Sequence, residues 1–333
     1  METNRFGRRD FIKYGLISSL FVLSGCSVSK NKLTLRGFSS SFPKELISSL
    51  SSSWEFYPIK DIKFSKFTYN SFLQENTDLL VINDGWISNL NVDLLKEINA
   101  PNIRNNLGKQ ARSFLVGLGE EYSKRIFPLA VSPWVLLIRN EESLDLKNKS
   151  SWEVLLSRAL ENEVVLPKSP YLLISIAQKI GLLNDLSKLK RQAKTFDDRN
   201  ALNWVVSGRA SAAVLPLSRC IDSLINDPRL SVLLPEDGTP LNWSVLVSPS
   251  LSSEPFPTDW ADLFFEKNSL KRIIRKGFLP SINFSYLSKK DINVSEKYQS
   301  ILLPDESVWN KCWSLPLLSF EEKKDLTLKW NNS

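Results

Sequence analysis

The sequence of 333 residues contains no histidine, one methionine and three cysteines. Without histidine the chain lacks the base of Ser-His-Asp and Cys-His nucleophile pairs, a common zinc ligand and the usual proton shuttle near neutral pH. Any catalysis would depend on carboxylate, lysine or tyrosine side chains alone. We therefore expect a protein that is not an enzyme and that holds no cofactor and no metal.

Apolar runs long enough to cross a membrane are also absent. The first apolar run, residues 14–23, has about ten residues, roughly half of what crosses a hydrocarbon core. It follows Arg8 and Arg9 and leads into Leu23-Ser24-Gly25-Cys26. Together these parts resemble a twin-arginine export signal that ends in the lipobox of a bacterial lipoprotein. The alternative is a chance arginine pair before a buried helix.

This N-terminus predicts where the protein works. We expect residues 1–25 to be a twin-arginine lipoprotein signal peptide, and we expect acyl groups on Cys26 to anchor the protein in the membrane. The mature chain would then lie on the periplasmic side of the bacterial inner membrane. Cys220 and Cys312 lie far apart without metal-type spacing, and they either pair after export or remain small buried apolar groups.

Composition adds two limits. The chain is 42% hydrophobic, and its length leaves room for a large core and two lobes of ordinary size. The net charge is +7, and its basic clusters fit solvated helix faces. Because an exported lipoprotein seldom meets nucleic acid, we expect no nucleic-acid partner.

Strand-like and helix-like segments alternate along the chain, which predicts an α/β fold. The unbroken apolar run in residues 78–83 is typical of a fully buried strand, and residues 127–138 form an extended stretch interrupted by Pro128 and Pro133. The other expected strands are residues 32–37, 164–166, 212–215, 232–234 and 243–247. The expected helices are residues 43–52, 86–98, 152–159, 171–180, 199–206, 258–265 and 269–276.

The order of several segments then resembles one family. These segments are Phe127-Pro128 to Asn140, Ser151-Trp152 to Leu156, Val164-Val165-Leu166-Pro167, Lys179-Ile180-Gly181 and Pro235-Glu236-Asp237-Gly238. They are similar to the hinge strand, the Ser-Trp-x-x-Leu segment, the apolar strand, the Lys-x-Gly helix end and the Pro-x-x-Gly turn of periplasmic polyamine-binding proteins of ABC transporters. The resemblance covers most of residues 33–280.

This resemblance implies a fold, a domain plan and a set of partners. The expected fold is α/β, a two-lobe periplasmic-binding-protein fold of type II, with mixed sheets flanked by helices and hinge strands between the lobes. Lobe 1 would comprise residues 32–128 and 240–285, lobe 2 residues 129–239, and residues 286–333 a helical segment that packs on a lobe. The protein would be a monomer that closes on a small solute, spermidine or putrescine in the family, and delivers it to an ABC permease.

The ligand positions depart from the family pattern. Asn242 and Ser244 stand where the family has an aromatic residue and a carboxylate, and Lys168 lies where the family has a second acidic site. Trp86 and Asp84 keep one aromatic wall and one candidate carboxylate. Because a buried ammonium group needs a negative charge and aromatic contact, a standard polyamine pocket is not supported.

Hydroxyl groups are the most frequent polar groups at the positions where the family would hold its ligand. Serines at predicted strand ends and helix starts favour anions or neutral polar groups, although each serine can equally be an N-cap or a turn former. The candidate ligand-binding residues are Phe38, Ser39, Asp84, Trp86, Ser132, Ser169, Tyr171, Ser218, Asn242 and Ser244.

Three functional hypotheses follow. The first is an ABC-type solute receptor of the polyamine-binding lineage, with either a polyamine or an altered anionic or neutral polar ligand. The second is a sensory or surface lipoprotein with the same lobes and no role in transport. The third is a hydrolase with paired carboxylates such as Asp197 and Asp198, or Glu120 and Glu121, although adjacent carboxylates in loops are usually only solvated.

Overall fold

The computed structural model describes residues 32–38, 47, 50–59, 69–74, 76–140 and 150–333. The predicted export signal with Arg8 and Arg9, the predicted lipid site Cys26 and the candidate Ser39 lie outside the described residues. Leu33–Ser333 form one compact unit. No helix in the described part of the chain is long and apolar enough to span a membrane.

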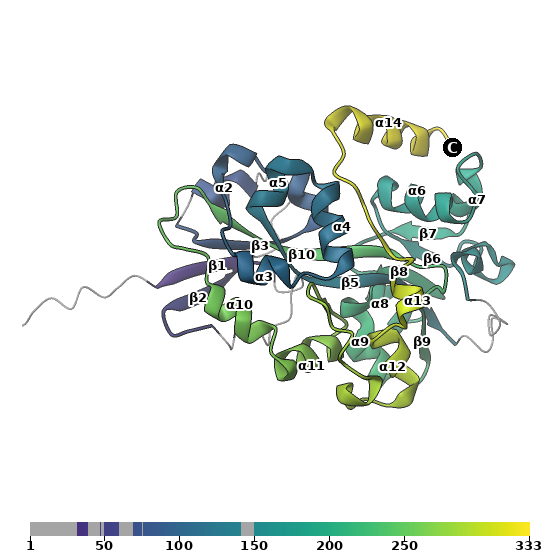
Figure 1. Ribbon diagram of the computed structural model, residues 1–333. Helices are drawn as coiled ribbons and strands as arrows, with labels where there is room; N and C mark the ends of the chain where they lie inside the picture. Colours follow the sequence, from purple (N-terminus) through teal and green to yellow (C-terminus); the bar gives the residue numbers. More distant parts are fainter. Residues whose placement is uncertain (1–31, 39–46, 48–49, 60–68, 75, 141–149) are drawn as a thin grey trace, which may run out of the picture. The chain divides into compact units, whose positions relative to one another are not determined.

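Strands and helices alternate along the chain, which confirms the α/β prediction (Figure 1). The strands are β1 (Leu33–Gly37), β2 (Trp54–Pro58), β3 (Leu79–Asn83), β4 (Leu95–Lys96), β5 (Ile126–Arg139), β6 (Val164–Leu166), β7 (Ala193–Phe196), β8 (Ala212–Pro216), β9 (Leu230–Leu233), β10 (Pro240–Pro249), β11 (Leu279–Pro280) and β12 (Trp313–Ser314). The sheet has the order β2-β1-β3-β10-β5-β8-β6-β7, with β4 and β12 paired to β10, and β9 and β11 paired to β5.

Helices flank the sheet along its whole length (Figure 1). The α-helices are α2 (Tyr69–Gln74), α3 (Pro101–Asn105), α4 (Lys109–Gly117), α5 (Gly119–Arg125), α6 (Pro170–Lys179), α7 (Leu186–Lys190), α8 (Ala201–Val206), α9 (Leu217–Asn226), α10 (Thr258–Phe264), α11 (Lys267–Arg275), α12 (Glu296–Leu302), α13 (Glu306–Trp309) and α14 (Phe320–Asn331). Short 3₁₀ helices are η2 (Asp84–Asn89), η3 (Val92–Leu94), η5 (Trp152–Leu156), η6 (Arg158–Leu160) and η7 (Lys289–Ile292).

The two longest strands, β5 and β10, connect the two parts of the sheet. We call β1, β2 and β3 the first group of strands and β6, β7 and β8 the second group. The first half of β5 pairs with β10 in antiparallel register, from Ile126 opposite Val247 to Pro133 opposite Leu241. From Trp134 onward the same strand pairs with β8 and β9 instead. The other edge of β10 pairs with β3. The extended stretch predicted at residues 127–138 is therefore present as a strand that crosses from one group of strands to the other.

A β-bulge interrupts the β5–β10 ladder. Ser244 lies opposite Ala130 and Val245 lies opposite Pro128, so that Leu129 is the extra residue. Proline has no backbone N–H to donate, which favours an irregularity at this point. Bulges bend a strand and change the direction of neighbouring side chains, and this one lies next to the end of β3.

Alternating side chains of the strands divide the core into two clusters. On β5, Val135 and Leu137 belong to the first cluster, which extends over β1, β3, β10, α9 and α11, whereas Leu136 and Ile138 belong to the second. The second cluster contains apolar side chains of α6 and α7 and the buried Trp152. Successive residues of a strand point to opposite faces, so the sheet at β5, β6 and β8 is covered on both faces.

Two expected helices are replaced by shorter elements. Residues 152–159, predicted as one helix, form η5 and the first part of η6. Residues 86–98, which we predicted as a helix, form η2, η3 and β4. The side chain of Asn91 accepts a hydrogen bond from the backbone N–H of Asp93, 3.1 Å away. Asn and Asp side chains that bond to nearby backbone groups compete with helix formation, and this competition explains the difference at residues 86–98.

Gly238 provides a test of how the turn before β10 packs. Its φ is +91°, and a Cβ atom there would lie 2.2 Å from the carbonyl oxygen of Lys311. We expect Gly238→Ala to lower the free energy of unfolding by about 3 kcal/mol, because it adds both backbone strain and a clash. Gly117→Ala is the matched control, since a Cβ atom at this helical position meets no atom within 4 Å. Equal urea midpoints for the two variants would contradict this packing.

Candidate functional site

At the end of β3, Asp84 has a carboxyl group whose pKa is strongly raised. Asp84 begins η2 directly after Asn83, which lies opposite Ser244 of β10. The backbone N–H of Gly85 donates to Asp84 Oδ1 at 3.0 Å. Water still reaches part of this side chain, but the protein surrounds it closely enough that burial raises its pKa to about 7, against the opposing effect of backbone hydrogen bonds from Trp243 and Gly85. A carboxyl group with so strongly raised a pKa is a functional-site candidate.

Tyr171 lies near Asp84 and belongs to α6, the helix that follows β6. It is the second residue of α6, and Ser169 caps that helix by accepting a hydrogen bond from the N–H of Leu172 at 3.3 Å. Burial raises the pKa of Tyr171, and the negative charges of Asp84 and Glu322 raise it further. The phenol of Tyr171 therefore lies within electrostatic reach of Asp84. The end of β3 and the start of α6 are therefore the two walls of the candidate site.

Ser132 and Ser218 form a pair deeper in the structure. Ser132 is fully buried in β5, and its Oγ accepts a hydrogen bond from the backbone N–H of Ser218 at 2.9 Å. Ser218 is the second residue of α9. The Ser132 hydroxyl therefore accepts a hydrogen bond from one of the N–H groups that have no partner within the helix. Asn242 is half-buried and lies opposite Ser132 on β10.

The wall at the start of α6 carries positive charge. The N–H of Lys168 donates to Asp198 Oδ1 at 3.1 Å, and the Arg219 guanidinium donates to the backbone carbonyls of Asp198 and Arg199. Burial raises the pKa of Asp198, whereas the charges of Lys168 and Arg219 oppose this change. Two cationic residues, Lys168 and Arg219, thus lie near one carboxylate at the start of α6.

The remaining candidates are less central. Phe38 and Trp86 are half-buried and pack against the first cluster, Phe38 after β1 and Trp86 within η2. Ser244 is fully buried at the bulge. The structure therefore brings Asp84, Trp86, Tyr171 and Ser244 to one region, and it joins Ser132 to Ser218 by a separate hydrogen bond.

The C-terminal segment adds groups that the sequence did not indicate. The indole Nε1 of Trp243 donates to Ser314 Oγ at 2.8 Å, and the Tyr171 hydroxyl donates to the carbonyl of Pro316 at 3.1 Å. Lys323 on α14 donates to Ser88 Oγ in η2. No motif in residues 286–333 indicates this arrangement, because the contacts depend on the path of the chain.

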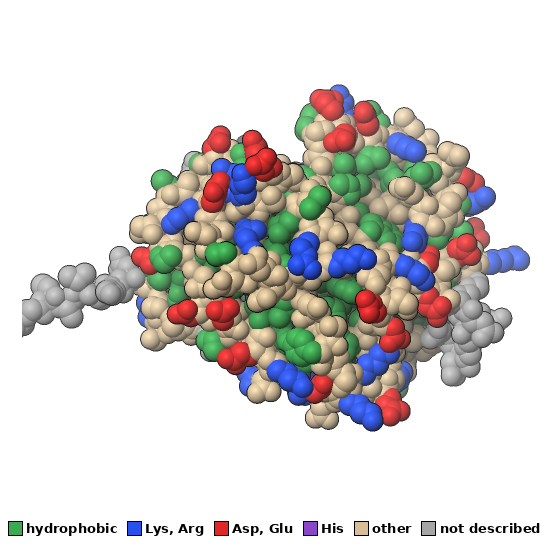
Figure 2. Space-filling view, in the orientation of Figure 1, with side chains coloured by type: hydrophobic (Ala, Val, Ile, Leu, Met, Phe, Trp, Pro, Cys, Tyr) green, Lys and Arg blue, Asp and Glu red, His purple; other side chains and the backbone are tan. Residues whose placement is uncertain are grey.

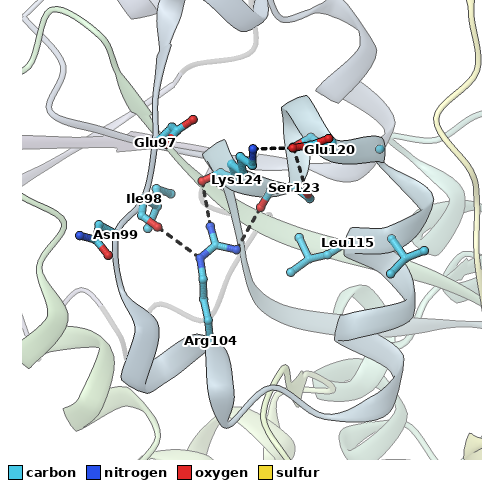
Figure 3. A pocket seen from close by; sticks show the side chains of 10 residues that line it. Glu97, Ile98, Asn99, Arg104, Leu115, Glu120, Ser123 and Lys124 are labelled. Atoms are coloured by element: carbon cyan, nitrogen blue, oxygen red, sulfur yellow. Dashed lines mark hydrogen bonds and ion pairs between the residues drawn. The ribbon is translucent and has the colours of Figure 1, made fainter.

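A hollow of about 690 Å³ lies elsewhere, among residues 97–124. Figure 3 shows Arg104 reaching across it from α3. Arg104 donates to four backbone carbonyls, those of Ile98, Ser123, Lys124 and Ile126, at 3.0–3.2 Å. These bonds hold α3 to α5, and neither Asp84 nor Tyr171 lines the hollow. We therefore place the candidate site at Asp84 and Tyr171.

Comparison with protein families identifies the chain. The family model of bacterial extracellular solute-binding proteins matches residues 68–312. The chain belongs to this family. In this solute-binding protein the matched region includes β3, the whole of β5 and β10, and the start of α6, and it ends just before Trp313.

Solved structures show the same fold at low sequence identity. The spermidine/putrescine ABC transporter substrate-binding protein of Streptococcus pneumoniae has a TM-score of 0.70 and 14% identity, over 91% of this chain and 99% of that one. The ferric ion-binding protein A of Pasteurella haemolytica has a TM-score of 0.60 and 12% identity, over 90% and 98%. The predicted two-lobe periplasmic-binding-protein fold is thus confirmed. No curated protein sequence matches the chain.

The carboxylate pairs that an enzyme could have used have other partners. Asp197 accepts hydrogen bonds from the backbone N–H groups of Arg199 and Asn200 at 2.9 and 3.0 Å. Although burial acts in the other direction, hydrogen bonds from Asn200, Trp204 and Arg199 lower the pKa of Asp197 to about 2. Glu120 forms an ion pair with Lys124 at 2.6 Å. The family is one of solute-binding proteins, and within the described residues no three His, Cys, Asp or Glu side chains gather as a metal site.

Asp84 predicts a pH dependence of stability. Its folded pKa, about 7, is above the ordinary value of 3.8, so the folded state binds more protons than the unfolded state between these pH values. The free energy of unfolding should therefore fall as pH rises through this window. Since water partly reaches Asp84, we expect the wild type to lose about 1–2 kcal/mol relative to Asp84→Asn between about pH 4 and pH 8.

Urea denaturation at both pH values measures this difference. The exposed Asp262 lies on the surface of α10, so Asp262→Asn is the matched control and should follow the wild type. Parallel pH profiles for wild type and Asp84→Asn would show that Asp84 titrates in its ordinary range.

Proposed function

We propose that this protein is the solute receptor of an ABC importer, from the lineage of the polyamine-binding proteins. The observation that carries the proposal is the family match over residues 68–312, together with a fold shared with a spermidine/putrescine substrate-binding protein over 99% of that chain. In this proposal residues 32–128 and 240–285 form lobe 1, and residues 129–239 form lobe 2. A solute that touches both lobes favours the closed state and is then passed to the permease.

The walls of the site favour a solute with fewer positive charges than spermidine. A polyamine needs a carboxylate near each ammonium group. Asp84 is only partly ionised near neutral pH, because burial raises its pKa to about 7. On the facing wall, Lys168 and Arg219 lie around Asp198. Repulsion between these cations and an ammonium group disfavours a long polyamine, and an anionic or neutral polar group fits better.

Thermal unfolding with added solutes tests the ligand class. We expect spermidine and putrescine at about 1 mM to leave the melting temperature nearly unchanged, and a neutral or anionic solute such as a sugar or a dicarboxylate to raise it. A ligand at 100 times its dissociation constant stabilises by about 2.7 kcal/mol. Lys168→Ala should reduce the response to an anion, whereas Lys324→Ala, an exposed lysine of α14, should leave it unchanged. A shift with spermidine alone would restore the polyamine as ligand.

A sensory role is the second candidate. One structure with a TM-score of 0.61 and 12% identity is described as a two-component system protein that mediates signal transduction. In this case the two lobes would close on the same solute and then contact a membrane sensor. Solute uptake that is lost in a deletion strain and restored by the gene would favour the importer.

Export and anchoring complete the proposal. Arg8 and Arg9 would direct the precursor to the twin-arginine route, and Cys26 would carry the acyl groups after cleavage. The receptor would act as a monomer beside its permease, held at the outer face of the inner membrane.

Replacing Cys26 tests the anchor. Cys26→Ala is expected to abolish acylation and to release the protein from the membrane fraction, because one residue accepts the lipid. Radiolabelled palmitate incorporation and fractionation measure both effects, with Cys220→Ala as the control that keeps the anchor. Replacement of Arg8 and Arg9 by lysine should retain the precursor in the cytoplasm. Membrane retention of Cys26→Ala would disprove the lipobox.

A further inference from the structure

The C-terminal segment crosses the candidate site instead of ending on one side of it. Trp313 begins β12, which pairs in parallel with Pro240 and Leu241 of β10, and its N–H donates to the carbonyl of Thr239 at 3.1 Å. From there the chain runs in extended form to Ser319, the N-cap of α14. Figure 1 shows this connection, in yellow, rising from β12 to α14 beside α6. We call residues 313–333 the strap.

The strap bonds to side chains on both walls of the site. Ser314 Oγ accepts from the indole of Trp243, whose backbone also bonds to Asp84. Two residues later, the carbonyl of Pro316 accepts from the hydroxyl of Tyr171. The strap therefore bonds both to β10, beside the end of β3, and to the start of α6.

Apolar side chains of the strap also contact both core clusters. Leu317 packs against the first core cluster, and Leu315 packs against the second, two residues away. An extended chain places successive odd residues on one side, so these two leucines follow a seam between the clusters. In Figure 2 the surface is indented between the part that carries α5 and the part that carries α14, with hydrophobic side chains along the indentation.

The end of the strap, α14, packs on α6 and on the second core cluster, to which it contributes Trp330 and the half-buried Leu326. Trp330 packs edge-on against Phe196 at 6.1 Å between ring centroids, with Lys190 over its ring. Lys190 also donates to the carbonyl of Ser333 at 3.0 Å. On the other side of the site, Lys323 donates to Ser88 Oγ in η2. Trp330 is the one buried side chain of α14, so this helix depends on a single large apolar anchor, supported by Leu326 and by polar contacts on both sides.

We infer that residues 313–333 are a built-in clasp, which joins η2 to α6 across the solute site and must release its α14 end before a solute can enter. The inference rests on the proposed function for the identity of the site. The clasp holds η2 and α6 together when no solute is bound. Its release sets the rate at which a solute enters. Detachment of one helix with a single buried anchor costs far less than unfolding of the domain.

Hydrogen exchange without any solute tests the clasp. In Trp330→Ala we expect amides of α14 and also of η2 to exchange about tenfold faster or more, because loss of the anchor uncovers the facing wall. In Lys323→Met the same two segments should exchange about two- to fivefold faster. Lys324→Met, a neighbouring exposed lysine, is the matched control and should change neither segment. Amides of α11 report global stability and should stay unchanged in all three variants.

Two results would overturn the inference. Faster exchange in α14 with unchanged exchange in η2 would show that α14 packs on α6 and covers nothing else. Unchanged exchange in both segments of Trp330→Ala would show that Trp330 is not the anchor. Because the measurement uses no solute, a failure of the proposed importer function would leave these results unaffected.

Discussion

The antiparallel ladder between β5 and β10 is the interaction on which the candidate site depends. β10 places Trp243 and Ser244 next to the end of β3, where Asp84 begins η2. β5 carries Ser132, which caps α9, and continues into the second group of strands through Trp134. Since both walls of the site are attached to this ladder, its register determines which side chains face one another.

The bulge at Ser244 shows how the ladder positions the chemistry. Pro128 cannot donate a ladder hydrogen bond, and the resulting irregularity lies at the level of Asn83 and Asp84. Burial of Asp84 beside this irregularity raises the pKa of its carboxyl group to about 7. The C-terminal strap bonds to Trp243, which follows Asn242 on β10, and to Tyr171 at the start of α6. Backbone irregularity, a perturbed carboxylate and a bridging segment therefore coincide at one place.

Much of the fold could be predicted from the sequence, because the buried strands have unbroken apolar runs. The runs at β3, β6 and β8 and the crossing strand β5 are all present, within one to two residues at each end. Helices α3, α4 and α5 were missed, since Gly108, Gly117 and Gly119 interrupt the periodicity, and Gly119 has a φ of +79°. Of the site, the sequence indicated Asp84 and Tyr171 by their place in the family pattern. The sequence could not reveal that Ser314, Pro316 and Lys323 lie beside them, because these contacts join residues more than 70 positions apart.

The central claim is that two walls attached to one ladder close on a solute, and an intramolecular distance tests it most directly. Spin labels at Val116→Cys on α4 and Ala159→Cys in η6 would lie at exposed positions on either side of the site. The native Cys220 and Cys312 are buried. With a solute that raises the melting temperature, pulsed electron resonance should show a shorter and narrower distance distribution than without it. An unchanged distribution in a protein saturated with that solute would contradict the account.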